Sequence, residues 1–244
     1  MDIQKILRQG LAEYDLTGRV DEQAARNLNI YCQLLLDKNR EMNLTAITDP
    51  ADVANLHMLD CAALLNCAEL EGKSLIDVGT GAGFPGMVLK MLTPSMEVTL
   101  LDSLNKRLDW LAEVCAALKL DGVNTVHQRA EEAGQDPSFR ERFDFATARA
   151  VADLSILCEL CLPFVKVGGK FLAMKGVGSG QEIEASEAAV RELGGALEQC
   201  FDYQIPKTDV IHRVVVVKKT APTPPRYPRR WAKIQKGPLS GHNR

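Results

Sequence analysis

From residue 74 onward, short apolar runs alternate with stretches of helical spacing, and this alternation constrains the fold more than any other feature. The apolar runs predict five strands: SLIDVG (74–79), EVTLLD (97–102), GVNTVH (122–127), FDFATA (143–148) and KFLAMK (170–175). The stretches between them predict helices over 85–91, 104–118 and 153–165. Strands that alternate with helices favour a parallel sheet with helices on both faces, an α/β doubly wound fold.

The stretch DVGTGAGFPG (77–86) follows the first predicted strand and can be read in two ways. From Gly81 it fits G-x-G-x-x-G, the pattern of a loop beneath a dinucleotide pyrophosphate, which would indicate a nicotinamide-dependent oxidoreductase. From Asp77 it fits D-x-G-x-G-x-G, the pattern of a loop that holds S-adenosylmethionine. No G-K-[ST] follows, so a phosphate-binding P-loop is excluded.

The end of the predicted sheet helps to separate these two interpretations. After a predicted helix over 181–193, LEQCFDYQI and HRVVVVKK predict two strands that are joined by a short turn near 206–210, with no helix between them. A standard dinucleotide-binding domain repeats βαβ units instead. The terminal antiparallel hairpin therefore favours a Rossmann-like sheet of the methyl-donor type.

The segments on either side of this sheet differ from it. Residues 1–66 read as a helical extension, with one helix over Asp21–Met42 capped by Asp21 and another from Asp49–Pro50 to about Asn66. Residues 67–219 form the predicted core. Residues 220–244 form a basic tail: eight lysines and arginines and no acidic residue occur between Lys218 and Arg244. Such a tail indicates contact with a polyanion or a solvated, disordered segment.

Composition excludes several other classes of protein. With 46% hydrophobic residues, the chain can bury a substantial core, but no apolar run is long enough to span a bilayer and the first residues lack the apolar region of a signal peptide. We therefore expect a cytoplasmic protein without a membrane partner. Cys158 and Cys161 form a lone C-x-x-C, so we expect reduced, buried thiols and no metal site.

In an open parallel sheet, ligands bind beyond the carboxyl ends of the strands, so the residues after each strand are the candidate site. Gly79, Gly81 and Gly83 follow the first strand, and the absence of a Cβ lets their backbone approach a ligand. Asp77 precedes them and suits a cationic amino group, although it could instead cap the turn. Asp102 follows the second strand at a spacing suited to ribose hydroxyls.

The later strands add further candidates. Beyond the third strand, Glu131 or the neighbouring backbone would lie beside an adenine ring. Arg149 follows the fourth strand, where it would stand at the centre of the cleft unless it forms a surface salt bridge. Lys175 follows the fifth strand and either faces the same rim or is a solvated strand end. No catalytic base is evident, so Arg149 and Lys175 are candidates for positioning a substrate.

The fourth-strand position also limits which atom can be methylated. Enzymes that methylate exocyclic amines carry [DN]-P-P-[YF] there, whereas this chain has TARA. Methylation of a pyrimidine carbon uses a covalent cysteine, commonly after proline, and no Pro-Cys pair occurs. Guanine N7 has a free lone pair at neutral pH and needs no base, so positioning could suffice.

A series of motifs along the whole chain resembles the RsmG (GidB) family of 16S rRNA guanine-N7 methyltransferases. In order, these are NLTAITDP (43–50), HMLDC (57–61), DVGTGAGFPG, LLDS-x-x-KR (100–107), ARAVA (148–152), AMKG (173–176), HRVVVVKK and YPRR-x-x-x-x-x-KGPL. The resemblance implies a class I S-adenosylmethionine-dependent methyltransferase fold behind a helical extension. The implied substrate is a guanosine in the decoding-region loop of 16S rRNA, as naked RNA or within the small ribosomal subunit.

The resemblance also assigns residues. The implied cofactor contacts are Gly79, Phe84, Ala130, Glu131 and Arg149. The motif His57-x-x-Asp60 departs mildly from the family, because Cys61 stands where a serine is usual; we interpret it as packing between the extension and the core, with an RNA contact as the alternative. In the tail, phosphate contacts are expected from Arg229, Arg230, Lys233 and Lys236.

Three alternatives remain open from the sequence. They are a methyltransferase acting on another nucleic acid or on a protein, a nicotinamide-dependent oxidoreductase that rests on GAGFPG alone, and a methyl-donor-binding RNA chaperone without catalysis.

Overall fold

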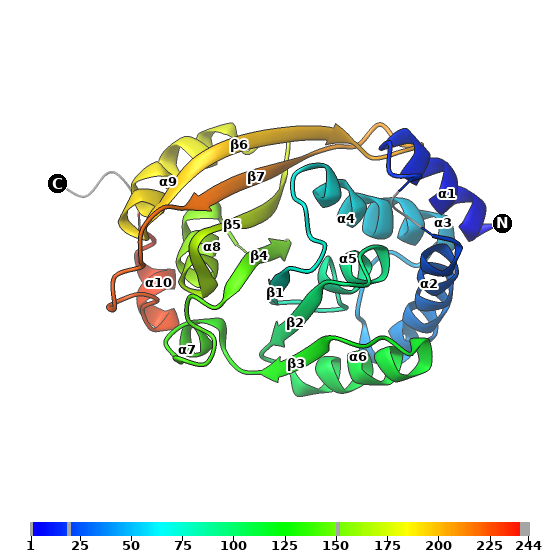
Figure 1. Ribbon diagram of the computed structural model, residues 1–244, viewed down its shortest axis with the longest axis horizontal. Helices are drawn as coiled ribbons and strands as arrows, with labels where there is room; N and C mark the ends of the chain where they lie inside the picture. Colours follow the sequence, from blue (N-terminus) through cyan, green and yellow to red (C-terminus); the bar gives the residue numbers. More distant parts are fainter. Residues whose placement is uncertain (1, 19–20, 150–151, 240–244) are drawn as a thin grey trace.

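The computed structural model describes residues 2–18, 21–149 and 152–239. One seven-stranded sheet crosses the molecule, and helices pack on both of its faces (Figure 1). The strands are β1 (Ser74–Val78), β2 (Glu97–Asp102), β3 (Val123–His127), β4 (Phe143–Arg149), β5 (Val165–Gly176), β6 (Gly195–Gln204) and β7 (Ile211–Lys219). The α-helices are α1 (Ile3–Glu13), α2 (Glu22–Met42), α3 (Pro50–Val53), α4 (Asp60–Ala62), α5 (Gly86–Leu92), α6 (Asn105–Leu118), α7 (Ala130–Ala133), α8 (Leu154–Cys161), α9 (Gly180–Glu192) and α10 (Trp231–Lys236).

The order of the strands confirms the doubly wound sheet with a terminal hairpin. The order is β3-β2-β1-β4-β5-β7-β6. β1 to β5 pair in parallel, whereas β7 lies antiparallel between β5 and β6. β7 is thus inserted where an all-parallel dinucleotide-binding sheet would place its sixth strand. The chain reverses its winding between β1 and β4, and that switch point is where an open sheet binds its ligands.

The N-terminal extension is helical, as predicted, but its second half is broken into short pieces. Asp21 caps α2 as expected, accepting a hydrogen bond from the backbone N–H of Ala24 at 2.7 Å. Instead of one helix from 50 to 66, the chain forms α3, a π-helix η1 (Ala54–Leu59), α4 and a 3₁₀-helix η2 (Ala63–Asn66). A π-turn accommodates one extra residue per turn and is often found at functional sites. Here it carries His57, and α4 directly after it carries Asp60.

The extension and the sheet share one hydrophobic core. Tyr31 and Leu35 of α2 are fully buried and belong to the same cluster as Leu100 of β2 and Leu111 of α6. The Tyr31 hydroxyl also donates to the carbonyl of Ala82 in the glycine-rich loop. In Figure 1 the extension wraps the side of the sheet that carries α5 and α6, while α7 to α10 lie on the other side. The boundary at residue 66 therefore divides the sequence but does not divide the core.

The C-terminal tail follows a defined path across the core as far as residue 239, which excludes a wholly disordered tail. Lys219 at the end of β7 is fully buried, and its ammonium group donates to the carbonyl of Leu162 and to the hydroxyl of Thr223, each at 2.6 Å. Burial lowers the pKa of Lys219 to about 8. These bonds hold the start of the tail against the sheet.

Cys158 and Cys161 are buried free thiols on α8, as predicted, and burial raises the pKa of both. Within residues 2–18, 21–149 and 152–239, no group of three or more histidine, cysteine and carboxylate side chains is arranged to hold a metal ion. None of the described helices combines the length and the apolar character needed to cross a membrane.

Candidate active site

A cavity of about 390 Å³ opens at the carboxyl ends of β1, β2 and β4, beside the switch point of the sheet. Its walls come from the carboxyl ends of β1, β2 and β4, from the turns after β1, β2 and β3, from α6, α7 and α8, and from the tail. The lining residues are Val78, Gly79, Leu101, Asp102, Ser103, Arg107, Gln128, Arg129, Ala130, Glu131, Arg149, Leu160 and Trp231.

Five of the predicted cofactor residues meet at this cavity: Gly79, Asp102, Ala130, Glu131 and Arg149. They lie at or just beyond the carboxyl ends of β1 to β4, and they are brought together because parallel strands present those ends at one edge. The other predicted residues lie elsewhere, and each of them has identifiable contacts.

The glycine-rich loop contains two kinds of glycine. Gly79, Gly81 and Gly83 all have positive φ, at 72°, 59° and 88°, which side chains rarely adopt. A Cβ at Gly81 would extend into open space, with its nearest neighbour, the carbonyl of Gly79, 3.9 Å away. A Cβ at Gly83 would lie 2.5 Å from the hydroxyl of Tyr31 and 2.7 Å from Cγ of Met87. Gly81 thus keeps the loop open, whereas Gly83 makes room for the N-terminal extension.

Asp77 is fully buried and caps the turn, which was the alternative interpretation of this residue from the sequence. Its Oδ2 accepts from the hydroxyl of Thr80 at 2.6 Å and from the backbone N–H of Gly86 at 2.9 Å. The first N–H of α5 is therefore already engaged within the protein. Oδ1 of Asp77 is buried and has no hydrogen-bond partner among the described residues. Burial raises the pKa of Asp77 to about 6, against the opposing effect of these two bonds.

Asp102 closes β2 with a carboxylate that is held in place from three sides. Oδ1 accepts from the N–H of Leu104 and Oδ2 from the N–H of Gly81, both at 2.9 Å. Arg107 on the first turns of α6 lies 3.4 Å from Oδ2. Asp102, the residue expected to bind ribose hydroxyls, therefore connects the glycine-rich loop to the turn that follows β2.

Arg149 lies at the rim of the cavity in a paired, largely buried position. Its Nη1 is 3.2 Å from Oδ2 of Asp60, and its guanidinium carbon stands 4.8 Å from the ring centroid of Phe84. Phe84 itself is buried, and its ring also packs on His57 at a centroid distance of 4.7 Å. Phe84 was predicted as a cofactor contact, but it is not among the described residues that line the cavity. Its ring instead packs against the guanidinium group of Arg149.

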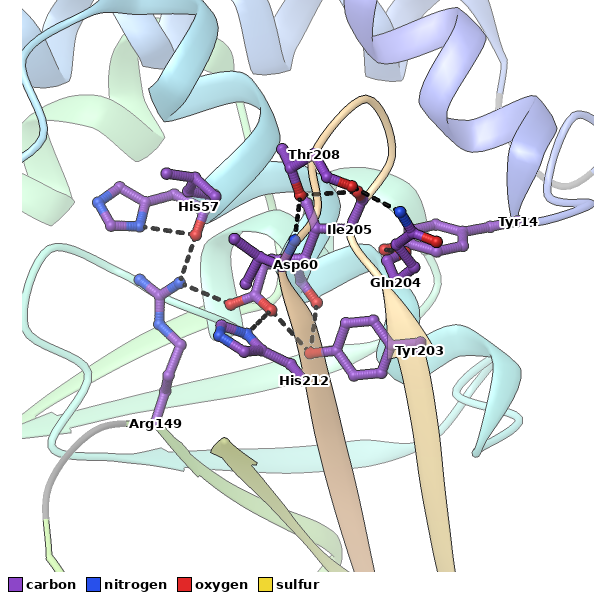
Figure 2. Close-up of polar contacts among 11 residues, drawn as sticks. Tyr14, His57, Asp60, Arg149, Tyr203, Gln204, Ile205, Thr208 and His212 are labelled. Atoms are coloured by element: carbon purple, nitrogen blue, oxygen red, sulfur yellow. Dashed lines mark hydrogen bonds and ion pairs between the residues drawn. The ribbon is translucent and has the colours of Figure 1, made fainter. Parts of the chain in front are cut away.

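Asp60 is the centre of the polar cluster in Figure 2. Besides Arg149, its carboxylate accepts from the hydroxyl of Tyr203 on β6 and pairs with Nδ1 of His212 on β7, both at 2.7 Å. Asp60 is only 2% exposed, so these partners satisfy a charge that is hidden from water. The bond to Asp60 raises the pKa of His212. Asp60 therefore joins the extension to β4, β6 and β7, which supports the packing interpretation of the His57-x-x-Asp60 motif.

His57 shows the opposite electrostatic behaviour within the same region. Burial, followed by the positive charge of Arg149, lowers its pKa to about 4, so the imidazole is neutral near pH 7. Its Nε2 lies 2.8 Å from the hydroxyl of Thr45, within the NLTAITDP segment. His57 thus packs the extension onto Phe84 without adding charge to the cleft.

Lys175 is paired away from the cavity. Its ammonium group lies 2.6 Å from Glu182 of α9 and donates to the carbonyl of Ala152 at 3.0 Å. Lys175 is not one of the cavity-lining residues in the described chain, and its role as a positioning residue stays a prediction. Ala150 and Val151 of the ARAVA motif lie outside the described residues.

The four basic residues predicted to contact phosphate fall into two groups. Arg229 forms a two-pronged pair with Glu159 of α8, at 2.8 and 2.6 Å, and Glu159 is fully buried. The guanidinium group of Arg229 is therefore paired with Glu159 and holds the tail against α8. Arg230, Lys233 and Lys236 are exposed on and beside α10.

Eight residues of the cavity wall were not predicted as site residues, among them Arg107, Leu160 and Trp231. Arg107 stands in the LLDS-x-x-KR motif, on the first turn of the helix that follows Asp102, and this position could have drawn attention to it. Leu160 reads as an ordinary core position of an amphipathic helix. Trp231 carries no local signal, because it reaches the cavity only after the tail has folded back across the sheet.

Comparisons with known proteins agree with this geometry. Residues 24–209 match the family described as rRNA small subunit methyltransferase G, or GidB. The protein of that name from Alkaliphilus metalliredigens is 44% identical over 240 residues, covering 98% of this chain and 100% of the relative. Its counterpart from Acetivibrio thermocellus is 42% identical, with 98% of both chains covered. The crystal structure of TrmN from Thermus thermophilus, 21% identical, covers 74% of this chain and 53% of its own with a TM-score of 0.53, which supports the fold. The chain therefore belongs to the rRNA small subunit methyltransferase G family.

Proposed function

We propose that this protein transfers a methyl group from S-adenosylmethionine to N7 of a guanine in 16S rRNA of the small ribosomal subunit. The observation that carries the proposal is the convergence of Gly79, Asp102, Ala130, Glu131 and Arg149 on one cavity at the switch point of the sheet. Family membership supports the same reaction, since the curated relatives are named as small-subunit ribosomal RNA methyltransferases.

The residues present fit S-adenosylmethionine. The open space beside Gly81 leaves room for a ligand to approach the loop backbone. Asp102 presents a fixed carboxylate toward the cavity, suited to ribose hydroxyls. The buried, unpartnered Oδ1 of Asp77 provides an acceptor near the same loop, suited to an ammonium group directly or through water. We propose Gly83 and Phe84 as indirect contributors, because their contacts support the loop and Arg149.

The chemistry asks the protein for positioning. When bound, the cofactor supplies an electrophilic methyl group on a sulfonium centre. Guanine N7 needs no deprotonation, so holding the base in line with that methyl group is the main requirement. Arg149 is fixed by Asp60 and by the ring of Phe84, and a guanidinium held in this way can donate to a carboxylate or carbonyl oxygen at the rim.

We propose that Arg230, Lys233 and Lys236 contact the RNA backbone. All three are exposed at the C-terminal side of the molecule, close to the cavity wall formed by Trp231. Contacts of this kind position an RNA without reading its sequence. We propose a cytoplasmic location, which a ribosomal RNA substrate supports.

The experiment is methyl transfer from labelled S-adenosylmethionine to naked 16S rRNA and to isolated small subunits. We expect label in one of these substrates, at a site that becomes alkali-labile as N7-methylguanine does. Gly81→Val is the matched variant that should lose cofactor binding. Label on adenine or on protein would favour the alternative substrates, and binding of NADH without binding of S-adenosylmethionine would overturn the proposal.

A further inference from the structure

The tail contributes a side chain to the cavity that the rest of the sheet forms. Trp231, the first residue of α10, lines the cavity together with Ala130 and Glu131 of α7 and Leu160 of α8. Trp231 and Glu131 also line a second cavity of about 770 Å³ on the tail side, so both residues form the partition between the two spaces. Figure 1 shows α10 near α7, on the side of the sheet that also carries α8 and α9.

The surroundings of Trp231 define what it would contact. Ala130 and Glu131 lie beyond β3 and are the residues expected beside the adenine ring, while Asp102 on the neighbouring strand is suited to the ribose. Leu160 and the indole of Trp231 add apolar surface to this end of the cavity. A purine ring in protein sites is held by stacking and apolar contact on its faces together with a few polar groups at its edge.

We infer that Trp231 is a cofactor-contacting residue at the adenine end of the cavity, and that the C-terminal segment therefore takes part in binding S-adenosylmethionine. This inference rests on the proposed function and assigns to the tail a task beyond RNA contact.

The tail is fixed firmly enough to serve as a wall. Arg229, next but one before Trp231, is held on the buried Glu159 by its side chain and by its backbone N–H at 2.8 Å. Ile234, one turn further along α10, is fully buried in the core cluster that includes Leu160. A side chain that is already in place loses little freedom when a ligand arrives.

A second set of contacts fastens the segment before Arg229. Arg140 donates to the carbonyls of Thr223 and Tyr227, at 2.7 and 2.8 Å, and Gln135 donates to the carbonyl of Pro228 at 3.0 Å. These bonds connect the tail to the segment that follows α7. The tail and α7, which both contribute residues to the cavity wall, are therefore fixed to each other.

The chain contains two tryptophans, which makes the inference accessible to fluorescence. Trp110 is buried on the opposite side of the sheet, where it stacks on Tyr31 at a centroid distance of 6.1 Å. In a titration with S-adenosylhomocysteine, we expect the emission change of the wild-type protein to persist in Trp110→Phe and to vanish in Trp231→Phe. A change that vanishes in Trp110→Phe and persists in Trp231→Phe would overturn the inference.

Affinity provides the second measurement. Because stacking on an aromatic side chain strengthens the binding of a base, Trp231→Ala should weaken S-adenosylhomocysteine binding about tenfold, as measured by calorimetry. Trp231→Phe should retain most of the affinity, and Gln235→Ala, at an exposed position of the same helix, should retain all of it. The melting temperature of each variant without ligand is the control for folding.

The outcomes separate the inference from the function on which it rests. If the wild-type protein binds no S-adenosylhomocysteine, the proposed function fails and this inference fails with it. If the wild-type protein binds and Trp231→Ala binds equally well, the inference alone is overturned. A tenfold loss in Trp231→Ala that Trp231→Phe largely restores would support it.

Discussion

Both segments that flank the sheet are attached through a buried carboxylate, but the two attachments run in opposite directions. Asp60 belongs to the N-terminal extension and reaches into the core, where it meets Arg149, Tyr203 and His212 on three different strands. Glu159 belongs to the core and receives Arg229 from the tail. Their exposed fractions are 2% and 0%, so each depends on its partners for compensation.

The difference between the two attachments concerns function. The Asp60 cluster holds an extension and at the same time orients Arg149 at the cavity. The Glu159 pair holds a tail whose next residues are Arg230 and Trp231. The first cluster includes an imidazole, which titrates near neutral pH, whereas the second uses a guanidinium, which remains charged. We therefore expect the contribution of the Asp60 cluster to depend on pH near neutrality and that of the Arg229–Glu159 pair to be independent of it there.

The largest expected effect is that of Asp60→Ala. The substitution leaves a guanidinium, a phenol and an imidazole without their shared acceptor, and breaking a buried ion pair by removing one partner costs about 3–5 kcal/mol. Because the extension shares its core with β2 and α6, we expect this loss in the global free energy of unfolding, as measured by urea denaturation.

The matched controls are Asp60→Asn, which keeps an acceptor for the Tyr203 hydroxyl, and Asp37→Ala, which removes an exposed carboxylate 3.7 Å from Arg40. Asp60→Asn should fall between the wild type and Asp60→Ala, and Asp37→Ala should change stability by less than about 0.5 kcal/mol. A loss below about 1 kcal/mol for Asp60→Ala would show that the cluster does not hold the extension.

Arg229→Ala should have the next largest effect, and it should be local. It leaves the Glu159 carboxylate buried without its partner, at a cost of about 3 kcal/mol, the lower end of the range for such pairs. The tail can loosen and admit water to Glu159, so we expect the loss as faster hydrogen exchange in residues 220–239. Arg226→Ala is the control, because Arg226 is an exposed residue paired with Glu192. Uniformly faster exchange across the sheet would contradict the distinction between the two attachments.

The third prediction uses pH to separate the attachments. The pKa of His212 is raised above its usual value of 6.5 by the bond to Asp60. The stability that this bond contributes is therefore fully present below pH 6.5 and declines as pH rises through the raised folded-state pKa. His212→Asn should cost about 1 kcal/mol in the lower range and progressively less above it, in denaturation series from pH 5.5 to 8.5. Arg229→Ala should show no such trend over that range, and a cost of His212→Asn that increases with pH would reverse the assignment.

The sheet was predictable because its signals are local. Apolar runs, helical spacing and the glycine-rich turn each lie within one short segment, and their order along the chain determines the parallel sheet and the hairpin. The local signals failed where pairing overrides them. β5 begins at Val165, earlier than the predicted start at 170, because Val165 pairs with Phe143 and a register shift carries the strand past Gly168 and Gly169.

The site was predictable only in part, for the opposite reason. Gly79, Asp102 and Arg149 follow strands, and the rule for open sheets places them at one edge without knowledge of the tertiary structure. Arg229 and Trp231 lie on a segment whose path is set by contacts with Glu159 and Arg140, far away in the sequence. The basic composition of the tail therefore indicated phosphate contact for the segment as a whole. Only the structure distinguishes Arg229, which is paired with Glu159, from the exposed basic residues after it.

The smallest expected effect concerns that separation. Arg230→Ala removes an exposed side chain, so its effect on the free energy of unfolding should stay within about 0.5 kcal/mol. If Arg230 contacts a phosphate, the slope of log affinity for 16S rRNA against log salt concentration should fall by about one unit. Arg40→Ala, on the exposed face of α2, is the control for a general loss of positive charge and should leave the slope unchanged. Equal slopes for Arg230→Ala and the wild type would mean that Arg230 contacts no phosphate. The tail would then contribute only through the pairing of Arg229 with Glu159 and through Trp231 in the cavity wall.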